Sequence, residues 1–190
     1  MPKTDHHRPF SRRLKAAFGA GLIALCGLTI SAQVPSGAAL AQEIGPSGLP
    51  LPRFVSLRAN RVNLRVGPGT NYAVEWMYLK PGLPMEIVQE YDNWRRVRDS
   101  QGAEGWINQS LLSGNRTAIV APWQAGKDVQ IQLHLEANPA SGVRAILEPG
   151  VIGSISACNG DWCQMEFDGH RGWVEQTQLW GAYPGESYTN

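Results

Sequence analysis

The sequence predicts an all-β protein in which one small module is used twice. Segments rich in β-branched and aromatic residues are short, and turn residues separate them about every 8 to 12 positions, which is typical of small barrels and sandwiches. No amphipathic helical run of useful length accompanies them. A set of turn and tryptophan landmarks then recurs in the same order further along the chain, which indicates a duplicated module.

The repeat is visible when residue numbers are subtracted. The turn Leu-Lys-Pro-Gly at 79–82 returns as Leu-Glu-Pro-Gly at 147–150, and Trp94 returns as Trp162, both 68 residues later. The Gly-Trp pair that begins at Gly105 returns 67 residues later. A period this long that occurs twice indicates tandem domains, because a solenoid needs three or more short units.

Residues 1–41 have the features of a secretory signal peptide. Basic residues precede an uncharged apolar run of 15 residues over 16–30, and Ala39-Leu40-Ala41 has the pattern of a cleavage site. The run is shorter than the ~20 residues that a spanning helix needs. An uncleaved anchor, a lipoprotein acylated at Cys26 and twin-arginine export are the alternatives. We expect general secretion, a periplasmic or secreted protein, and no membrane span after cleavage.

Removal of this segment changes the charge of the chain. The mature protein keeps 12 basic and 15 acidic residues, a net charge of −3, which gives no support to nucleic-acid binding. The charge is divided unevenly, since residues 53–116 carry +3 and residues 117–190 carry −5. Either the two modules attract each other, or the first faces an anionic ligand, unless the difference is ordinary surface variation.

The mature chain is expected to divide into four parts. Residues 42–52, rich in Gly, Pro and Leu, form a flexible leader. The first domain spans 53–116, a connector spans 117–128, and the second domain spans 129–190. The connector is short and apolar, so Trp123 is expected to pack at the junction. Domains of roughly 60 residues are marginally stable alone, and packing against each other would help both.

Five strands are predicted in the first module. Residues 62–66 alternate apolar and polar side chains before a Gly-Pro-Gly loop, and residues 74–79 form a second strand that ends at Pro81-Gly82. Met85 and Ile87 share one face of a third strand. The last two strands are residues 94–98 and 105–108. Five short strands in this order fit a small, strongly bent barrel.

These residues resemble a known family. The resemblance is to the bacterial Src homology 3-like (SH3b) domain, and it covers the module from end to end. It rests on Asn63-Leu64-Arg65, Gly67-Pro68, Tyr72, Leu79-Lys80-Pro81-Gly82, Asn93-Trp94, Val97 and Gly105-Trp106-Ile107. The resemblance implies two tandem small SH3-like β-barrels that bind cell-wall peptide or protein ligands in the periplasm or at the envelope.

Side-chain alternation indicates which tryptophans lie outside the core. If Ile87 pairs near Val97 inside the barrel, Arg95 lies on the Val97 side and Trp94 on the opposite face. By the same rule Trp106 and Ile107 point to opposite faces, and Ile107 is the better core residue.

Outward tryptophans next to a loop aromatic would form a peptide groove. Trp94, Trp106 and Tyr72 supply rigid apolar surface with polar tips, and Arg65 or Arg96 would hold a ligand carboxylate. The predicted ligand-binding residues are Arg65, Tyr72, Trp94 and Trp106. The alternative is that both tryptophans shield the ends of the barrel or the interface with the second module.

The second module opens differently from the first. Residues 133–139 replace the first copy's Leu-Arg-Val-Gly-Pro-Gly-Thr, and no aromatic residue stands where Tyr72 does. This departure puts a shared ligand in question.

Cys158 and Cys163 are predicted to form a disulfide, because they are the only cysteines left in an exported chain. Pairing Ile155 with Met165 would place Cys158 opposite Trp162, so a β-bulge is required. The corresponding positions of the first copy, Glu90 and Arg95, are expected to form an ion pair.

Catalysis and metal binding are not expected. The mature chain holds two histidines, His134 and His170, and a cell-wall hydrolase would need a further domain of about 100 residues or more. The Cys and His spacings fit no zinc pattern. We therefore expect a non-enzymatic protein without cofactor or metal, which recognises peptidoglycan stem peptide or another wall ligand through its first module. The alternatives are a protein-protein adaptor for an envelope protein in the periplasm and a structural protein whose modules pack together.

Overall fold

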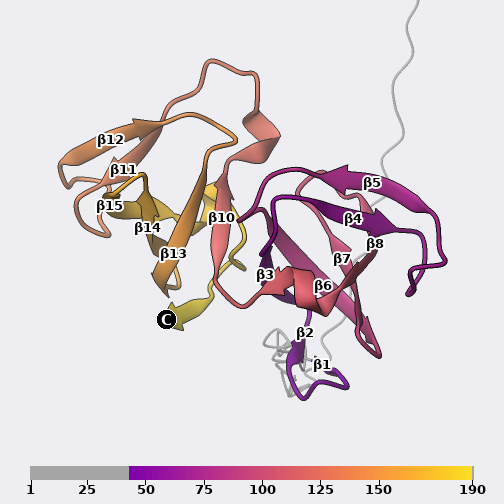
Figure 1. Ribbon diagram of the computed structural model, residues 1–190. Coiled ribbons are helices and arrows are strands. Elements are labelled where there is room, and N and C mark those ends of the chain that lie inside the picture. The colour runs from indigo at the N-terminus through magenta and orange to yellow at the C-terminus, as the bar shows by residue number, and fades with distance from the viewer. Residues whose placement is uncertain (1–42, 190) are drawn as a thin grey trace, which may run out of the picture. The chain divides into compact units, whose positions relative to one another are not determined.

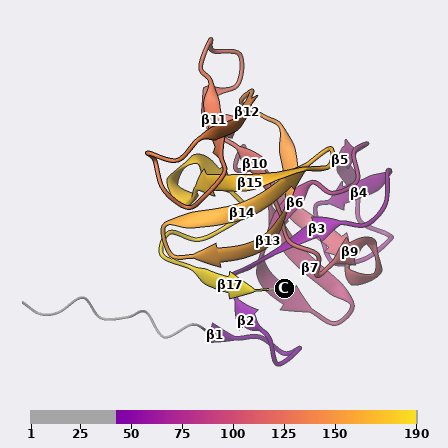
Figure 2. The same ribbon diagram turned by 90° about the vertical axis from the view of Figure 1, so that its left-hand side faces the viewer.

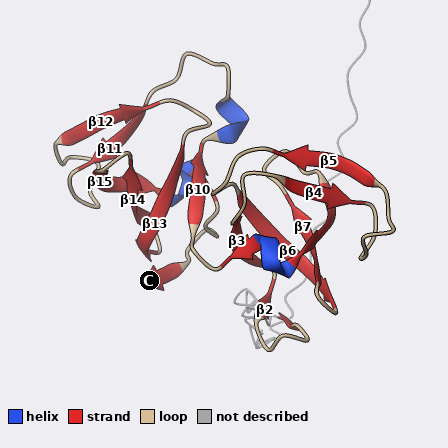
Figure 3. Cartoon of the chain, in the orientation of Figure 1, coloured by secondary structure: helices blue, strands red, loops and turns tan. Residues whose placement is uncertain are grey.

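The structure is a computed structural model that describes residues 43–189, so the expected signal peptide lies outside the described residues. Strands dominate this part of the chain, and its helical elements are three-residue turns of 3-10 helix: η1 (Gln109–Leu111), η2 (Pro122–Gln124) and η3 (Gln176–Gln178) (Figure 3). The all-β fold class is thereby confirmed. In this part of the chain no helix has the length and apolar character needed to cross a membrane.

The first module is a curled antiparallel sheet of seven strands in the order β5-β4-β8-β7-β6-β3-β9 (Figure 1). Its strands are β3 (Arg53–Leu57), β4 (Val62–Arg65), β5 (Val74–Tyr78), β6 (Pro84–Tyr91), β7 (Trp94–Arg98), β8 (Glu104–Asn108) and β9 (Leu112–Ser113). The five predicted strands correspond to β4 through β8, while β3 and β9 were not predicted.

The second module repeats this order strand for strand, as β12-β11-β15-β14-β13-β10-β16. Its strands are β10 (Thr117–Val120), β11 (Ile131–His134), β12 (Val143–Leu147), β13 (Ile152–Asn159), β14 (Trp162–Phe167), β15 (His170–Glu175) and β16 (Leu179–Trp180). An additional strand, β17 (Ser187–Thr189), pairs with β13, and Figure 2 shows β13, β14 and β15 side by side.

Two segments that were expected to be irregular carry strands. The expected connector, 117–128, begins with β10, which pairs with β13 and β16 as β3 pairs with β6 and β9. Trp123 follows in η2 and is largely exposed, so the expectation that it packs at the junction was wrong. The expected flexible leader, 42–52, contains the hairpin β1 (Glu43–Ile44) and β2 (Pro50–Leu51).

The core of each module follows the predicted alternation. Val62 and Leu64 of β4 are buried, as are Val97 of β7 and Ile107 of β8. Met85 and Ile87 are both buried, as expected for one face of β6, and Arg95 is buried on the side of Val97. Of the positions between these residues, Asn63 of β4 is half-buried, whereas Glu86 of β6 is buried as well. The second core is built around Val120, Leu133, Ile155, Met165 and Val174.

The recurring Gly-Trp pair has a packing reason. A Cβ on Gly105 would lie 2.6 Å from Leu64 Cγ, and a Cβ on Gly172 would lie 2.6 Å from Leu133 Cγ and 2.6 Å from the His134 carbonyl oxygen. Only glycine therefore lets β8 cross β4, and β15 cross β11, at this distance. The Pro-Gly turn recurs for another reason, since Gly82 and Gly150 adopt φ of +73° and +94°.

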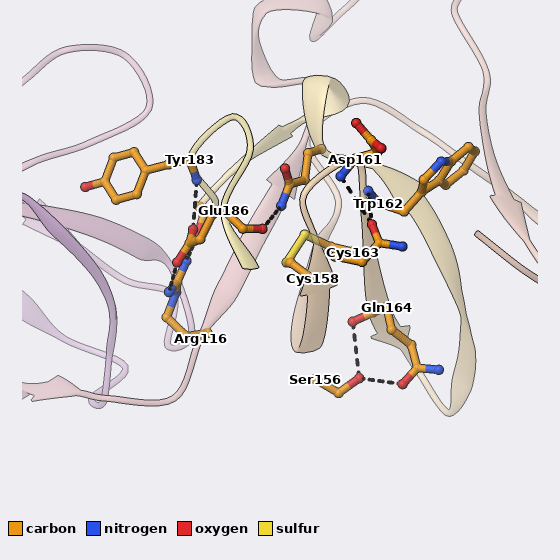
Figure 4. Close-up of a disulfide and its surroundings, with 12 residues drawn as sticks. Arg116, Ser156, Cys158, Asp161, Trp162, Cys163, Gln164, Tyr183 and Glu186 are labelled. Carbon is orange, nitrogen blue, oxygen red and sulfur yellow. Dashed lines mark hydrogen bonds and ion pairs between the residues drawn. A yellow bond between two sulfur atoms is a disulfide. The ribbon is translucent and has the colours of Figure 1, made fainter. Parts of the chain in front are cut away.

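A β-bulge occupies the same place in both modules. The register shifts between Ile155 and Ala157, which brings Cys158 opposite Cys163, and the two form the predicted disulfide (Figure 4). The shift between Ile87 and Gln89 places Glu90 opposite Arg95, where Arg95 Nε lies 3.2 Å from Glu90 Oε1. The ion pair and the bulge of the second module were predicted from the sequence, whereas the bulge of the first module was not.

Both sheets belong to one compact unit, and side chains join them. The Phe54 ring packs against Trp180 at 5.1 Å and Tyr183 at 4.7 Å, measured between ring centroids. Thr117 Oγ1 donates a hydrogen bond to the Gly82 carbonyl, 2.8 Å away. The residues that follow β16 are therefore part of the contact with the first sheet.

Candidate functional site

A groove lies on the outward face of the first sheet where β4, β7 and β8 adjoin. We call it the first-module groove. Its volume is about 320 Å³, and it is lined by Arg61, Asn63, Arg65, Thr70, Trp94, Asn108 and Leu111.

Strand alternation places these side chains in the groove. Val62 and Leu64 enter the core, so Asn63 and Arg65 project from the other face of β4. Arg61, which directly precedes the strand, also lines the groove. On the far side of the groove, Trp94 of β7 stands opposite Asn108 of β8 in the strand register. Three strands thus hold cationic, amide and indole groups around one depression.

The groove has two positive charges without a matching carboxylate. Within residues 43–189, neither Arg61 nor Arg65 forms an ion pair, whereas Arg53, Arg95, Arg96 and Arg98 all do. Arg65 Nη1 donates a hydrogen bond to the Tyr72 carbonyl, 2.6 Å away, which fixes its guanidinium at the edge of the groove. The arrangement suits an anion, because a guanidinium binds a carboxylate through paired hydrogen bonds.

Asn63 adds an unused acceptor. Its Oδ1 is buried and, among the described residues, has no hydrogen-bond partner. A buried polar atom without a partner costs about 1–3 kcal/mol, so such atoms are uncommon and call for an explanation. A ligand N–H that enters the groove would satisfy it.

Two of the four predicted ligand-binding residues share this groove, namely Arg65 and Trp94. Tyr72 does not line it, because its exposed ring covers Gly67, where a Cβ would come within 2.3 Å of Tyr72 Cδ1. Trp106 stands opposite Arg65 in the strand register, and its ring meets that of Tyr91 edge to face at 6.4 Å.

The polar residues of the groove differ from the sequence prediction in two respects. Arg96, the other carboxylate-binding candidate, forms an ion pair with Glu104 at 2.9 Å. Arg61 and Asn63 line the groove but were not predicted, although they continue the two-residue period that leads to Arg65. That period was the signal that could have found them.

The second module has a groove at the same place, which we call the second-module groove. Its volume is about 220 Å³, and it is lined by Gln130, Gln132, His134, Pro139, Trp162, Glu175 and Gln178. His134 occupies the position of Arg65, Trp162 that of Trp94, and Glu175 that of Asn108. The depression is therefore retained although its chemistry is changed.

A larger pocket of about 450 Å³ lies beside the edge strand β5 and is mainly apolar. Trp76 is 61% exposed on it, and Ile119 of the second sheet also lines it. The carboxylate of Asp99 is occupied there, since Oδ2 accepts from the Tyr78 hydroxyl at 2.9 Å and Oδ1 accepts from two backbone amides. The pKa of Tyr78 is raised, mainly because the hydroxyl is buried and secondly because it is bonded to Asp99. Trp76 was not among the residues predicted to bind a ligand.

Comparison with known protein families gives one match in each module. The sequence profile of the bacterial SH3 domain matches residues 58–114 and 127–181, together more than half of the chain. No curated protein matches the chain.

Two solved structures are similar to parts of the chain. NlpC2 from Trichomonas vaginalis is 13% identical with a TM-score of 0.30, over 68% of this chain and 48% of that one. NlpC1 from the same organism is 12% identical with a TM-score of 0.29, over 77% of this chain and 51% of that one. The chain thus spans about half the length of each.

Proposed function

The chain belongs to the bacterial SH3 domain family, and from this premise we propose that it is a non-catalytic binding protein of the bacterial envelope. Its first-module groove holds a cell-wall ligand, the stem peptide of peptidoglycan. A periplasmic or secreted location accompanies this proposal, since the wall is reached only after export.

The observation that carries the proposal is the pair of guanidinium groups, from Arg61 and Arg65, that have no ion-pair partner among residues 43–189. A stem peptide brings carboxylates for these cations, amide N–H groups for Asn63 Oδ1, and short aliphatic side chains for the Trp94 indole. The two guanidinium groups, the Asn63 acceptor and the indole then each have a counterpart in the ligand.

The size of the groove also favours a short peptide. About 320 Å³ falls at the lower end of the range for small-ligand sites, which is about 300–1,000 Å³. A stable protein partner would instead cover about 800 Å² of the surface. The adaptor function is therefore the second outcome of the test below.

Co-sedimentation of the chain with purified peptidoglycan sacculi tests the proposal. We expect retention that Trp94→Ala abolishes and that Arg65→Gln reduces about tenfold, because a charge-assisted hydrogen bond contributes about 1.5–3 kcal/mol. Trp123→Ala and Arg58→Gln are the matched controls, since both residues are exposed and lie outside the groove. They should leave retention unchanged.

The outcomes separate the two functions. If the unaltered chain is not retained, or if Trp94→Ala and Trp123→Ala are retained equally, wall binding through this groove is refuted. An envelope protein that co-purifies in stoichiometric amount, and is lost with Trp94→Ala, would establish the adaptor function instead.

A further inference from the structure

The two grooves have the same construction but opposite charge. The first contains two arginines and no carboxylate, whereas the second contains Glu175 and neither Lys nor Arg. We propose that the second-module groove is a second ligand site, and that it binds the ammonium group of an amine-bearing ligand rather than a carboxylate.

The strand registers show that the two sites are equivalent. Trp162 stands opposite Glu175, as Trp94 stands opposite Asn108. His134 pairs with Trp173 where Arg65 pairs with Trp106. The framework of the groove is therefore the same in both modules, while most of the side chains that line it differ.

The floor of the second-module groove is rigid. Trp162 is 8% exposed and His134 is 7% exposed, and their rings meet edge to face at 5.3 Å. The Trp162 amide donates to Asn159 Oδ1 at 2.8 Å, and Ser141 Oγ lies 3.5 Å from His134 Nδ1. A ligand would therefore meet a preformed surface and lose little affinity to rearrangement.

Glu175 is available for a ligand, in contrast to Asn108. Asn108 Oδ1 caps η1, where it accepts from Ser110 N at 3.1 Å and Ser110 Oγ at 2.8 Å. Glu175 precedes η3 in the same way, but its side chain makes no capping hydrogen bond. Across residues 43–189 its carboxylate has neither an ion pair nor a hydrogen bond, although the residue is half-buried.

The remaining groups of the groove complete an ammonium site. An ammonium donates three hydrogen bonds, one of which the Glu175 carboxylate accepts. The amide oxygens of Gln130, Gln132 and Gln178 are acceptors for the others. The adjacent Trp162 indole adds attraction for a cation. The excess negative charge of residues 117–190, which is −5, has the same sign.

Nuclear magnetic resonance of the ¹⁵N-labelled chain tests this site. The probe is N-acetyl-lysine amide, which carries one ammonium and no carboxylate, and N-acetyl-norleucine amide is its uncharged analogue. We expect the lysine probe to shift the Trp162 indole signal in a saturable manner and the norleucine probe to bind at least tenfold more weakly. The Trp94 indole signal should stay in place.

Three variants show which charge is responsible. Glu175→Gln should weaken lysine-probe binding about tenfold, the effect of about 1.4 kcal/mol. Asp168→Asn removes one negative charge from the exposed turn between β14 and β15, outside the groove, and should have little effect. Gln130→Arg places a cation at an exposed position of the groove, as in the first module, and should also weaken the lysine probe.

Two results would overturn the proposal. One is equal binding of the lysine and norleucine probes at Trp162. The other is equal loss of affinity in Glu175→Gln and Asp168→Asn, which would mean that the probe responds only to the overall charge of the module. Neither result depends on whether the first-module groove binds peptidoglycan.

Discussion

The Tyr183 hydroxyl donates a hydrogen bond of 3.0 Å to Glu86 Oε1, which lies 97 residues earlier in the chain. Glu86 is 7% exposed, and Arg98 donates to its other oxygen from Nε at 2.8 Å and from Nη2 at 2.6 Å. Burial, together with the negative charge of Glu86, raises the pKa of Tyr183, so the hydroxyl keeps its proton. The segment after β16 is thereby bonded to β6 of the first sheet.

Removing this hydroxyl should destabilise the protein. We expect Tyr183→Phe to lower the free energy of unfolding by about 1.5–3 kcal/mol, because the lost hydrogen bond has a buried, charged acceptor. Urea denaturation measures the difference. Tyr91→Phe, at a largely exposed ring, is the control and should change stability by less than about 0.5 kcal/mol. Equal midpoints for the two variants would mean that the bond adds nothing net.

Stability should fall in acid as Glu90 is protonated. Burial acts to raise the pKa of Glu90, but hydrogen bonds from the Ser47 amide, Arg53 and Ser47 Oγ outweigh it and lower the pKa from 4.5 to about 2. A folded-state pKa below the unfolded value means that the contribution is complete above pH 4.5 and is lost as the pH falls toward 2. Urea midpoints measured at intervals across this range test the expectation.

The matched variant is Glu90→Gln. The Glu90 side chain is 2% exposed and pairs with Arg53 at 2.6 Å and Arg95 at 3.2 Å, so removing its charge should cost about 3 kcal/mol at pH 7. The variant should also lose part of the acid dependence. A parent and variant whose stabilities decline in parallel below pH 4.5 would assign the acid effect to other carboxylates.

Alternation was the most reliable guide that the sequence offered. It placed Val97, Arg95 and Ile107 inward and Trp94 outward, because a two-residue period can be read from neighbouring positions alone. The bulge beside Cys158 was also predictable, since two cysteines had to face each other across a hairpin. These features depend on short stretches of chain and on simple strand geometry.

Features that rest on distant contacts could not be predicted. The hairpin of β1 and β2 is held by Ser47, whose partner Glu90 lies 43 residues away. The role of β10 depends on pairing with β13 and β16, which nothing within the four residues of β10 reveals. The second-module groove was missed for a related reason: apart from Trp162, its lining matches the first groove in position and not in residue type.

The disulfide should contribute modestly to stability. It joins residues separated by 5 in sequence, and closing so short a loop removes little entropy from the unfolded chain. We expect the double variant Cys158→Ala/Cys163→Ala to lose about 2 kcal/mol or less and to keep its fold. Guanidinium denaturation of parent and variant gives the value. A loss well above 4 kcal/mol, or an unfolded variant, would show that the bridge is needed to form the hairpin.

The glycines of the two Gly-Trp pairs connect packing to the grooves. In Gly105→Ala the new Cβ would lie 2.9 Å from the Arg65 carbonyl oxygen, and in Gly172→Ala it would lie 2.6 Å from the His134 carbonyl oxygen. Because these contacts are with backbone, β4 or β11 must move, and we expect a loss of about 1–3 kcal/mol in each case. Gly114→Ala is the control, since a Cβ there meets nothing within 4 Å.

Each variant should also damage the groove of its own module, because Arg65 and His134 are lining residues. Gly105→Ala should weaken retention on sacculi and leave the lysine-probe shift of Trp162 in place, whereas Gly172→Ala should do the reverse. If either variant loses both retention on sacculi and the lysine-probe shift, the strain spreads between the modules through the contacts of Phe54 with Trp180 and Tyr183. Loss of neither would mean that the strands absorb a methyl group without moving the groove.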